Sequence, residues 1–417
     1  MKVRRLCIRF AEWIAMGLSV SACGGCPCKQ ITVIEEVAPE DLPPDATAPA
    51  EAVEEPAAPA ADAVTPSEET SDTGEAPWWN IPYPSRFDAT RLKNHPSFIS
   101  VKGNKFVNEA GETVIFKGVN IADPDKIRRE GHWDAALFDA VASWGANVVR
   151  IPVHPAAWRG LGRDKYFELL DQAVVWADER NLYLIIDWHS IGNLEKELFQ
   201  HGMYVTTKQE TFEFWRAVSY RYQDIPTAAF YDLFNEPTVY NGNLGTETWA
   251  EWKQLNEEII SIIYSHDKKV IPLVAGFNWA YDLSEIKKHP IEREGIAYVS
   301  HPYPQKVGAP YEKSWTRDFG YVAKKYPLFV TEIGYMRPDA PGAHIPVMDD
   351  GSYGKRITDY LDKIGASWTA WCFHPYWPPQ LISDWEFTPT ESGEYFKEVM
   401  LGEKEGPGKK DAVDKND

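Results

Sequence analysis

Residues 230–237 read FYDLFNEP, an apolar run that ends in Asn235 and Glu236 and is closed by a proline. A short run rich in aromatic and β-prone residues, followed by proline, predicts a buried strand with polar side chains at its carboxyl end. A second run, LFVTEIG at residues 328–334, has the same pattern and carries Glu332. We therefore take Glu236 and Glu332 as a candidate catalytic pair held by two strands of one sheet.

Apolar runs of strand length recur along the chain, with amphipathic stretches between them. The eight runs are 114–119, 146–151, 182–186, 229–234, 270–275, 296–299, 328–330 and 367–371. Stretches with helical periodicity include 133–144, 165–180, 211–223 and 246–264. Strands that are apolar throughout suit a parallel sheet covered by helices, because both faces are buried. Eight of them alternating with helices predict an α/β fold, a (β/α)8 TIM barrel, preceded by a small hairpin within residues 98–116.

Chemically distinctive side chains lie at or just past the carboxyl end of seven of the eight runs. They are Asn120, Arg150, His189, Asn235 with Glu236, His301 with Tyr303, Glu332 and Trp371. In a barrel all of these ends face the same mouth. Each residue alone has a structural interpretation, such as a buried ion pair, but their coincidence predicts one functional site. No glycine-rich phosphate loop follows any run, which argues against nucleotide binding.

The N-terminal part of the chain is expected to lie outside the folded domain. Residues 1–22 combine a basic opening with a short apolar stretch, the pattern of a signal peptide, and the sequence VSAC at 20–23 resembles a bacterial lipobox, which implies lipidation of Cys23. Residues 23–77 are rich in Pro, Ala and Glu and predict a disordered tether. The catalytic domain is then expected at 78–402, and a disordered tail at 403–417.

Composition narrows the class of protein further. The 417 residues carry a net charge of −19, so a basic nucleic-acid binder is excluded and no nucleic-acid partner is expected. Cys372 is the one cysteine of the predicted domain, so no disulfide framework is expected. We expect a monomer in the bacterial cell envelope, lipid-anchored at the outer membrane on its surface or periplasmic face, or secreted, that contacts membrane only through its anchor.

The chain resembles glycoside hydrolase family 5, the cellulase family A of retaining (β/α)8 glycosidases. The resemblance runs from KGVN at 117–120 to Trp371 and is most specific at Asn235-Glu236-Pro237 and at TEIG, residues 331–334. It implies that Glu236 is the acid/base and Glu332 the nucleophile. It also implies supporting roles for Arg150 and His189 near the carboxylates and the sugar, Asn235 at the 2-hydroxyl, His301 and Tyr303 beside the nucleophile, and Trp371 as an aromatic platform.

Hydrolysis with retention needs one protonated and one ionised carboxyl, about 5 to 5.5 Å apart. We expect Arg150 and Tyr303 to lower the pKa of Glu332, and Glu236 to be less well paired. This chemistry needs neither a cofactor nor a metal. Further aromatic side chains suit a β-linked polysaccharide or oligosaccharide. Of these, Trp279 and Trp377 are the preferred sugar contacts, and Trp188 is expected to be part of the barrel wall. About half of the aromatic set is expected to be buried in the core; the set is Trp158, Trp188, Trp279, Trp315, Tyr376 and Trp377.

The leading hypothesis is a retaining endo-β-1,4-glucanase. Alternatives with the same chemistry are a β-mannanase or a hydrolase of mixed-linkage glucan or xyloglucan. Loops at 190–204 and 373–382 are expected to decide between these substrates. A hypothesis of another class is a non-catalytic glycan-binding lipoprotein, because a fold alone does not fix an activity. The presence of both carboxylates favours the enzyme.

Overall fold

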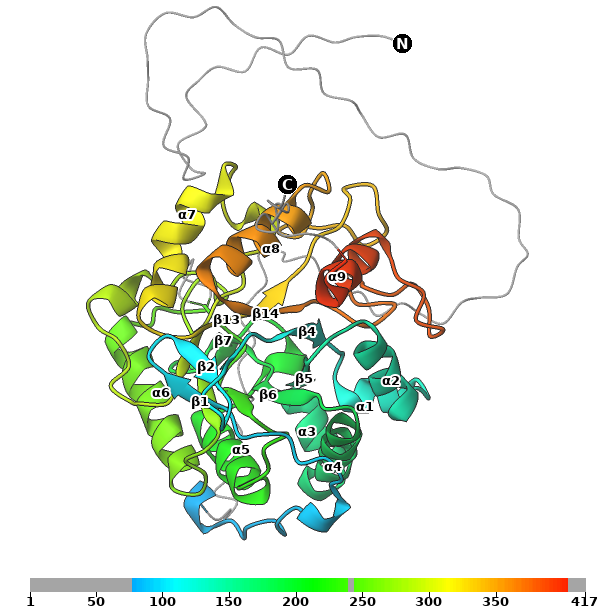
Figure 1. Cartoon of the computed structure of the whole chain (residues 1–417). Helices are drawn as coiled ribbons and strands as arrows, with labels where there is room; N and C mark the ends of the chain where they lie inside the picture. The colour runs from blue at the N-terminus through cyan, green and yellow to red at the C-terminus, as the bar shows by residue number, and fades with distance from the viewer. Residues whose placement is uncertain (1–76, 239–243, 404–417) are drawn as a thin grey trace, which may run out of the picture. The chain divides into compact units, whose positions relative to one another are not determined.

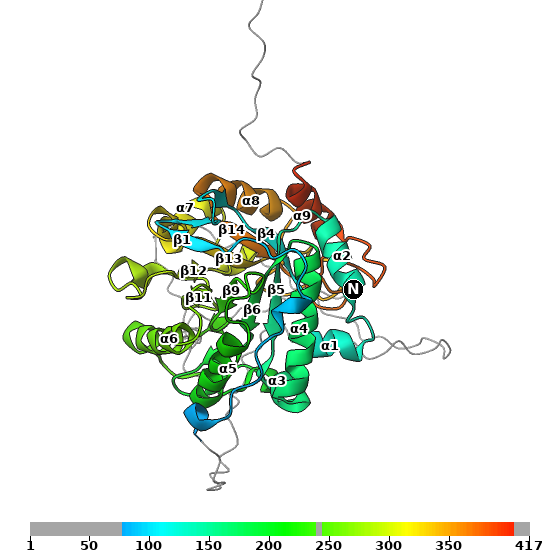
Figure 2. The ribbon, with the colours of Figure 1, turned by 60° about the horizontal axis from the view of Figure 1, so that its bottom comes forward.

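The computed structural model describes residues 77–238 and 244–403. Eight parallel strands close into a barrel: β4 (Lys117–Asn120), β5 (Val148–Val153), β6 (Tyr183–Trp188), β9 (Phe230–Asp232), β11 (Ile271–Ala275), β12 (Ala297–Val299), β13 (Leu328–Ile333) and β14 (Ser367–Ala370). Strand β14 pairs with β4 and closes the ring. Figure 2 shows the strands in this ring, with α4, α5 and α6 outside it. The predicted TIM barrel is confirmed.

Helices cover the barrel on its outer side (Figure 1). The α-helices are α1 (Pro124–Arg129), α2 (Ala135–Ser143), α3 (Pro155–Leu161), α4 (Arg163–Glu179), α5 (Lys208–Arg221), α6 (Trp249–Tyr264), α7 (Tyr311–Asp318), α8 (Tyr353–Ile364) and α9 (Glu391–Leu401). The 3-10 helices are η1 (Trp78–Asn80), η2 (Ala89–Arg91), η3 (Gly202–Tyr204), η4 (Ser284–Lys287), η5 (Pro304–Lys306) and η6 (Gly320–Lys324). The local sequence determines where several of these helices begin or end. Helix α6 begins with a capping box of Thr248 and Glu251, and α8 ends at Gly365 in the left-handed conformation.

The amino end of the barrel is closed by a small antiparallel sheet of β1 (Ser100–Lys102), β2 (Lys105–Val107) and β3 (Thr113–Val114). The predicted hairpin is therefore β1 and β2, and a third strand extends it. The ring of Phe106 lies 5.3 Å from that of Phe230, 5.7 Å from Phe116 and 5.9 Å from Phe329. We call these four buried residues the phenylalanine floor. It fills the end of the barrel opposite Glu236 and Glu332.

A second small sheet lies at the carboxyl end of the barrel strands, which we call the mouth. It consists of β8 (Leu198–Phe199), β7 (Ile191–Asn193) and β10 (Glu236–Pro237). Glu236 pairs with Ile191 in parallel register, and its backbone N–H donates to the carbonyl of Ser190 at 3.1 Å. The loop after β6 thus holds the backbone that carries Glu236.

The observed strands overlap all eight predicted runs but differ from each at one or both ends, and two runs are also interrupted. The run 114–119 is divided between β3 and β4, because Val114 pairs in the antiparallel sheet whereas β4 starts at Lys117. The run 229–234 is a strand only to Asp232, and the chain then leaves the barrel ladder before Glu236 pairs in β10. Eight strands and their order were nevertheless predicted.

Some predictions concern residues outside the described ranges. The signal peptide 1–22, the lipidation site Cys23 and nearly all of the tether 23–77 fall there, as does the tail 403–417 except for its first residue. Within 77–238 and 244–403, no helix combines the length and the apolar character needed to cross a membrane.

Candidate active site

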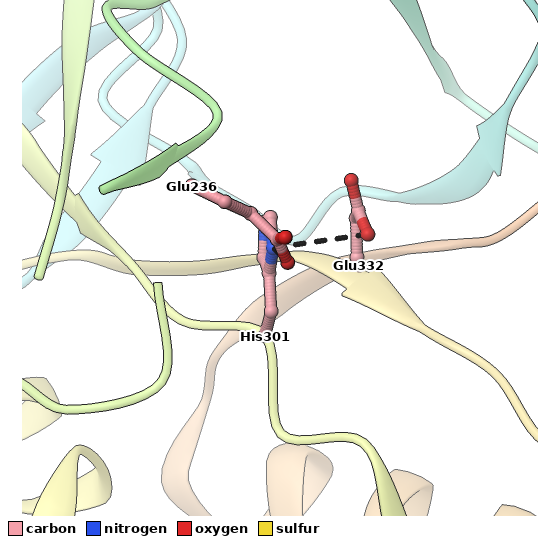
Figure 3. A group of neighbouring side chains, drawn as sticks. All are labelled: Glu236, His301 and Glu332. Carbon is pink, nitrogen blue, oxygen red and sulfur yellow. Dashed lines mark hydrogen bonds and ion pairs between the residues drawn. The ribbon is translucent and has the colours of Figure 1, made fainter. Parts of the chain in front are cut away.

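Glu236 and Glu332 lie close together at the mouth, and both are buried. An oxygen of each carboxyl and a ring nitrogen of His301 lie within 4.8 Å of one another. Figure 3 shows the two carboxyl groups side by side, with the imidazole of His301 next to Glu236. Glu332 comes from β13 and Glu236 from β10. The short separation matches the arrangement in which one carboxyl attacks a sugar while the other transfers a proton.

Arg150, fully buried on β5, is the centre of the polar network. Its Nη1 donates to Glu332 Oε1 at 2.9 Å and to Asn120 Oδ1 at 3.0 Å. Its Nε and Nη2 bind Asp232 Oδ2 at 3.0 and 2.9 Å. Burial acts to lower the pKa of Arg150, but the carboxylates of Asp187, Asp232 and Glu332 raise it above its ordinary value. Arg150 is thus a permanent cation beside Glu332.

The amide of Asn235 is oriented by the same arginine. Its Oδ1 accepts a hydrogen bond from Arg150 Nη2 at 2.8 Å. Because the oxygen faces Arg150, the amide nitrogen is the end that can donate to a sugar hydroxyl. The amide orientation therefore suits the predicted contact with a 2-hydroxyl.

Glu332 is surrounded by donors. Tyr303 donates from its hydroxyl to Oε2 at 2.7 Å, and His301 Nδ1 lies 3.7 Å from the same oxygen. As predicted, Arg150 and Tyr303 act to lower the pKa of Glu332, and His301 does so too, but burial raises it and the net shift is upward. Desolvation of the carboxylate outweighs these contacts.

Glu236 has a different environment. Its Oε1 lies 2.9 Å from His301 Nδ1, and His301 Nε2 lies 2.9 Å from Thr331 Oγ1. Burial raises the pKa of Glu236 to about 7, against the opposing charges of Lys306 and Arg150. Burial also lowers the pKa of His301 to about 3, so His301 is a neutral partner. A carboxyl with this pKa holds its proton near neutral pH and can release it during a reaction.

One side of the mouth is lined with aromatic rings. Trp371 follows β14, and its ring is nearly parallel to those of His189 and Trp377, at centroid distances of 5.4 and 6.0 Å. His189 Nδ1 lies 2.6 Å from Asp187 Oδ2, which fixes the plane of the imidazole. We call Trp371, Trp377 and His189 the aromatic wall.

A cavity of about 250 Å³ lies beside Trp377 and is also lined by Asp123, Lys126 and His154. The ammonium of Lys126 lies 5.5 Å from the Trp377 ring centre. Nε2 of the buried His154 has no hydrogen-bond partner among the described residues, whereas its backbone N–H donates to Asp123 Oδ2 at 2.9 Å. An aromatic ring beside buried polar groups is the combination that a sugar ring with its hydroxyls requires.

The structure separates the remaining aromatic candidates. Trp158, Trp188, Trp315 and Trp377 are buried, four of the six where about half was expected, and Trp188 packs on Phe214 at 4.1 Å. The burial of Trp377 leaves it a smaller exposed surface than was expected for a preferred sugar contact. Tyr376 is 54% exposed. Trp279 follows β11 and is half-buried. Its Nε1 donates to Gln200 Oε1 at 2.8 Å.

Sequence reasoning missed four residues of this network: Asp187, Asp232, Thr331 and Lys306. Asp187 and Asp232 are fully buried carboxylates inside apolar strands, so their positions within IIDW and FYDLF were the available signal. Thr331 and Lys306 carried no comparable signal, because one polar residue next to a glutamate or on a loop is common.

Glu236, His301 and Glu332 are also a group close enough to hold a metal ion by distance alone. The guanidinium of Arg150 lies 2.9 Å from Glu332. A fixed positive charge at that distance opposes a divalent cation. The trio fits proton and sugar chemistry better than metal binding.

The family model described as Cellulase (glycosyl hydrolase family 5) matches residues 107–376. The chain belongs to this family. Its members are retaining glycosidases with a TIM barrel. A β-glucanase from Saccharophagus degradans, solved in complex with cellotetraose, is 55% identical, covers 78% of this chain and 99% of its own, and superposes with a TM-score of 0.76.

More distant relatives carry the name endoglucanase. Endoglucanase A of Butyrivibrio fibrisolvens is 25% identical over 304 residues, which are 70% of this chain and 61% of that protein. Endoglucanase E-5 of Thermobifida fusca is 24% identical over 66% of this chain and 55% of its own length. This chain thus spans less than two thirds of the length of either relative. The catalytic domain of Thermobifida fusca endoglucanase Cel5A, at 20% identity and a TM-score of 0.58, shares the fold.

Proposed function

We propose that the chain is an endo-acting β-1,4-glucanase that works by double displacement, with Glu332 as nucleophile and Glu236 as acid/base. The observation that carries the proposal is the pair of buried carboxyls within 4.8 Å whose surroundings differ. Glu332 contacts Arg150 and Tyr303, whereas Glu236 contacts a neutral histidine. Such a difference assigns the anion to one and the proton to the other.

In the first step Glu332 attacks the anomeric carbon and forms a covalent glycosyl-enzyme, while Glu236 gives its proton to the leaving oxygen. Arg150 and Tyr303 hold the attacking carboxylate in place and in its charged form. The amide of Asn235 donates to the 2-hydroxyl, where hydrogen bonds strengthen in the transition state.

In the second step Glu236 acts as base toward a water molecule. Once Glu332 is esterified its negative charge is gone, so Glu236 loses a like-charged neighbour and holds its proton less tightly. The deprotonated Glu236 then takes a proton from water, which attacks the glycosyl-enzyme and restores Glu332. His301, fixed between Glu236 and Thr331, keeps the carboxyl aimed through both steps.

The glucan assignment draws support from the S. degradans β-glucanase, which was solved with cellotetraose and is 55% identical. The aromatic wall supports a ligand of several sugar units. The test is a panel of carboxymethylcellulose, mixed-linkage β-glucan, xyloglucan and mannan, with products separated by chain length. We expect a spread of oligosaccharides from the first of these. Monosaccharide or a single oligomer alone would contradict endo action, and cleavage of mannan alone would favour a β-mannanase.

The roles of the two carboxyls are tested with Glu332→Ala and an activated aryl glycoside. Azide should restore turnover by taking the place of the carboxylate and should yield a glycosyl azide of inverted configuration. No rescue would contradict the nucleophile assignment. Substrate binding without any hydrolysis by the wild-type protein would instead favour a non-catalytic glycan-binding lipoprotein.

We also propose that Cys23 carries lipid, that residues 23–77 tether the domain to the bacterial envelope, and that the domain is a monomer. The basic opening and the VSAC sequence support the anchor. Metabolic labelling with a fatty-acid analogue should mark the wild-type protein and leave Cys23→Ala unmarked. Sedimentation of the domain would test the monomer.

A further inference from the structure

Tyr303 belongs to a small apolar cluster that is separate from the main core. The buried side chains of Tyr303, Met336 and Val347 form this cluster, and Ala340 and Ala343 pack against it. Neither of the two larger clusters of buried side chains within residues 77–238 and 244–403 includes Tyr303. The apolar packing of this tyrosine therefore comes from the segment between β13 and α8 rather than from the barrel core.

That segment folds back on itself. The backbone N–H of Met336 donates to the carbonyl of Val347, and that of Asp349 donates to the carbonyl of Met336, both at 3.0 Å. Met336 and Met348 also form a parallel bridge. We call residues 336–348 the tyrosine clamp. Its two ends lie side by side and bring Met336 and Val347 together.

The tyrosine clamp is bonded to the chain on one side of Tyr303, and the helix after it is bonded to the chain on the other. The backbone N–H of Gln305 donates to the carbonyl of Pro346 at 2.9 Å, and its side-chain amide donates to a second carbonyl of the clamp at 3.0 Å. The hydroxyl of Tyr353, the first residue of α8, donates to the carbonyl of Pro302. The backbone before and after Tyr303 is thus held by one continuous segment.

The nucleophile lies at the start of the same segment. Glu332 of β13 accepts the hydrogen bond from the Tyr303 hydroxyl at 2.7 Å, and the chain then runs through Gly334 to Met336. A Cβ on Gly334 would lie 3.6 Å from Cε1 of Tyr303, so the backbone at this point lies against the ring. One stretch of chain therefore carries the attacking carboxylate and also packs the side chain that binds it.

The charged and titratable groups that act on Glu332 come from outside the tyrosine clamp. They are Arg150, Asp187, Glu236, His301, Tyr303 and Lys306. The hydrogen bond from Tyr303 is one of the interactions that lower the pKa of Glu332. An apolar substitution in the clamp therefore reaches the charge of Glu332 through the position of Tyr303.

We propose that Met336 and Val347 are positioning residues, which hold the Tyr303 ring so that its hydroxyl stays on the nucleophile. This inference rests on the proposed function. A misplacement of about 1 Å caused by a residue far from the chemistry can cost on the order of 100-fold in rate. Packing between two loops can thus control a reaction in which neither Met336 nor Val347 takes part.

The first test is Met336→Ala with 4-nitrophenyl β-cellotrioside as substrate. We expect kcat to fall roughly three- to tenfold, which is part of the cost of losing a hydrogen bond to a charged group. A weaker hydrogen bond leaves the pKa of Glu332 higher, so the acidic limb of the kcat/KM profile should move to higher pH. Met336→Leu keeps the apolar volume and should leave both kcat and the acidic limb near those of the wild type.

A double substitution separates positioning from a general loss of stability. In Tyr303→Phe the hydrogen bond is already absent, so the addition of Met336→Ala should lower kcat by less than about twofold more. Losses that multiply in the double variant, together with an acidic limb that Met336→Ala leaves in place, would overturn the positioning role.

Val347→Ala tests the tyrosine clamp independently, and Val322→Ala is its matched control. Val347 and Val322 are 3% and 1% exposed, so the two substitutions remove the same buried methyl groups. Val322 lies on η6 and packs in the main core. Well below the melting temperature, Val347→Ala should lower kcat and move the acidic limb to higher pH, whereas Val322→Ala should lower only the melting temperature.

The outcomes distinguish the clamp from the activity itself. Equal kinetic effects of Val347→Ala and Val322→Ala would overturn the role of the clamp and leave the glucanase function standing. A wild-type protein that cleaves neither the aryl cellotrioside nor cellotetraose would overturn the glucanase function, and the positioning role with it.

Discussion

The two ends of the barrel differ in the chemistry of the side chains that fill them. At the amino end, the phenylalanine floor packs Phe106 of the small sheet against Phe116, Phe230 and Phe329. At the mouth, Arg150 of β5 is hydrogen-bonded to Glu332 of β13, and Glu236 of β10 is bonded to His301. The amino end contributes apolar packing, whereas the mouth contains buried charged groups. Substitutions at the amino end should therefore change the unfolding free energy, and substitutions at the mouth should change the kinetics.

The largest expected effect is at the mouth. Glu332→Gln keeps the shape of the side chain but removes the nucleophile, so we expect kcat to fall by roughly 10⁴-fold or more, as for other enzymes that lose the attacking group. The melting temperature should stay the same or rise, because the substitution removes a carboxyl whose burial disfavours its charged form. If Glu332→Gln kept activity within tenfold of the wild type, Glu332 would not be the nucleophile, and the difference between the two ends of the barrel would not hold.

Phe116→Ala should have the next largest effect, on stability. Phe116 is fully buried and contacts Phe106, Phe230, Phe329 and Tyr183. Truncation of such a side chain costs about 3–5 kcal/mol of unfolding free energy. Denaturant titration measures this loss. Well below the melting temperature, kcat/KM should remain within about threefold of the wild type, and a selective loss of activity would show that floor and mouth are not separable.

Tyr303→Phe should lower kcat by roughly 10- to 100-fold, because it removes the hydrogen bond to Glu332 Oε2. That hydrogen bond lowers the pKa of Glu332, so its loss raises the pKa. The nucleophile must be ionised, so the acidic limb of the kcat/KM profile should move to higher pH. Tyr222→Phe is the control, since Tyr222 donates at 2.9 Å to Asp171, a carboxylate outside the catalytic network. An unshifted acidic limb in Tyr303→Phe would argue against Glu332 as the ionised partner.

The smallest effect is expected for Phe106→Leu. The substitution keeps most of the apolar volume and removes the ring contacts, each pair of which contributes about 0.5–1.5 kcal/mol. A modest loss of unfolding free energy with unchanged kinetics would confirm that the small sheet serves stability. A change in KM would contradict that role.

The sequence predicted the ring of strands and most of the residues at its mouth, because both follow from local pattern. Apolar runs indicate strands that are buried on both faces, and the residues that follow these strands lie together at the mouth. Arg150, His301 and Tyr303 were found in this way, and the structure brings each into contact with a catalytic carboxyl.

Contacts between distant segments were beyond such reasoning. The third strand at Thr113 and the pairing of Glu236 with Ile191 depend on how separate pieces of chain meet. The lowering effects of Arg150 and Tyr303 on the pKa of Glu332 were predicted, but the larger effect of burial was not, since it depends on how completely the folded chain removes water from the carboxyl. The position of the Lys306 ammonium, 5.0 Å from the centre of the Trp279 ring, also depends on the meeting of two separate loops.

The pairing of β10 with β7 bears on how enzymes of this kind can be engineered. Residues 190–204 are the natural segment to exchange when a different glycan is wanted. Yet Ser190 and Ile191 at its start hold the backbone of Glu236. A transplanted loop that replaces Ser190 and Ile191 would therefore also change the contacts that hold the backbone of Glu236. Exchanges that start after Asn193 would leave β7 and its pairing with Glu236 intact, so a library of loop variants should vary the residues after Asn193.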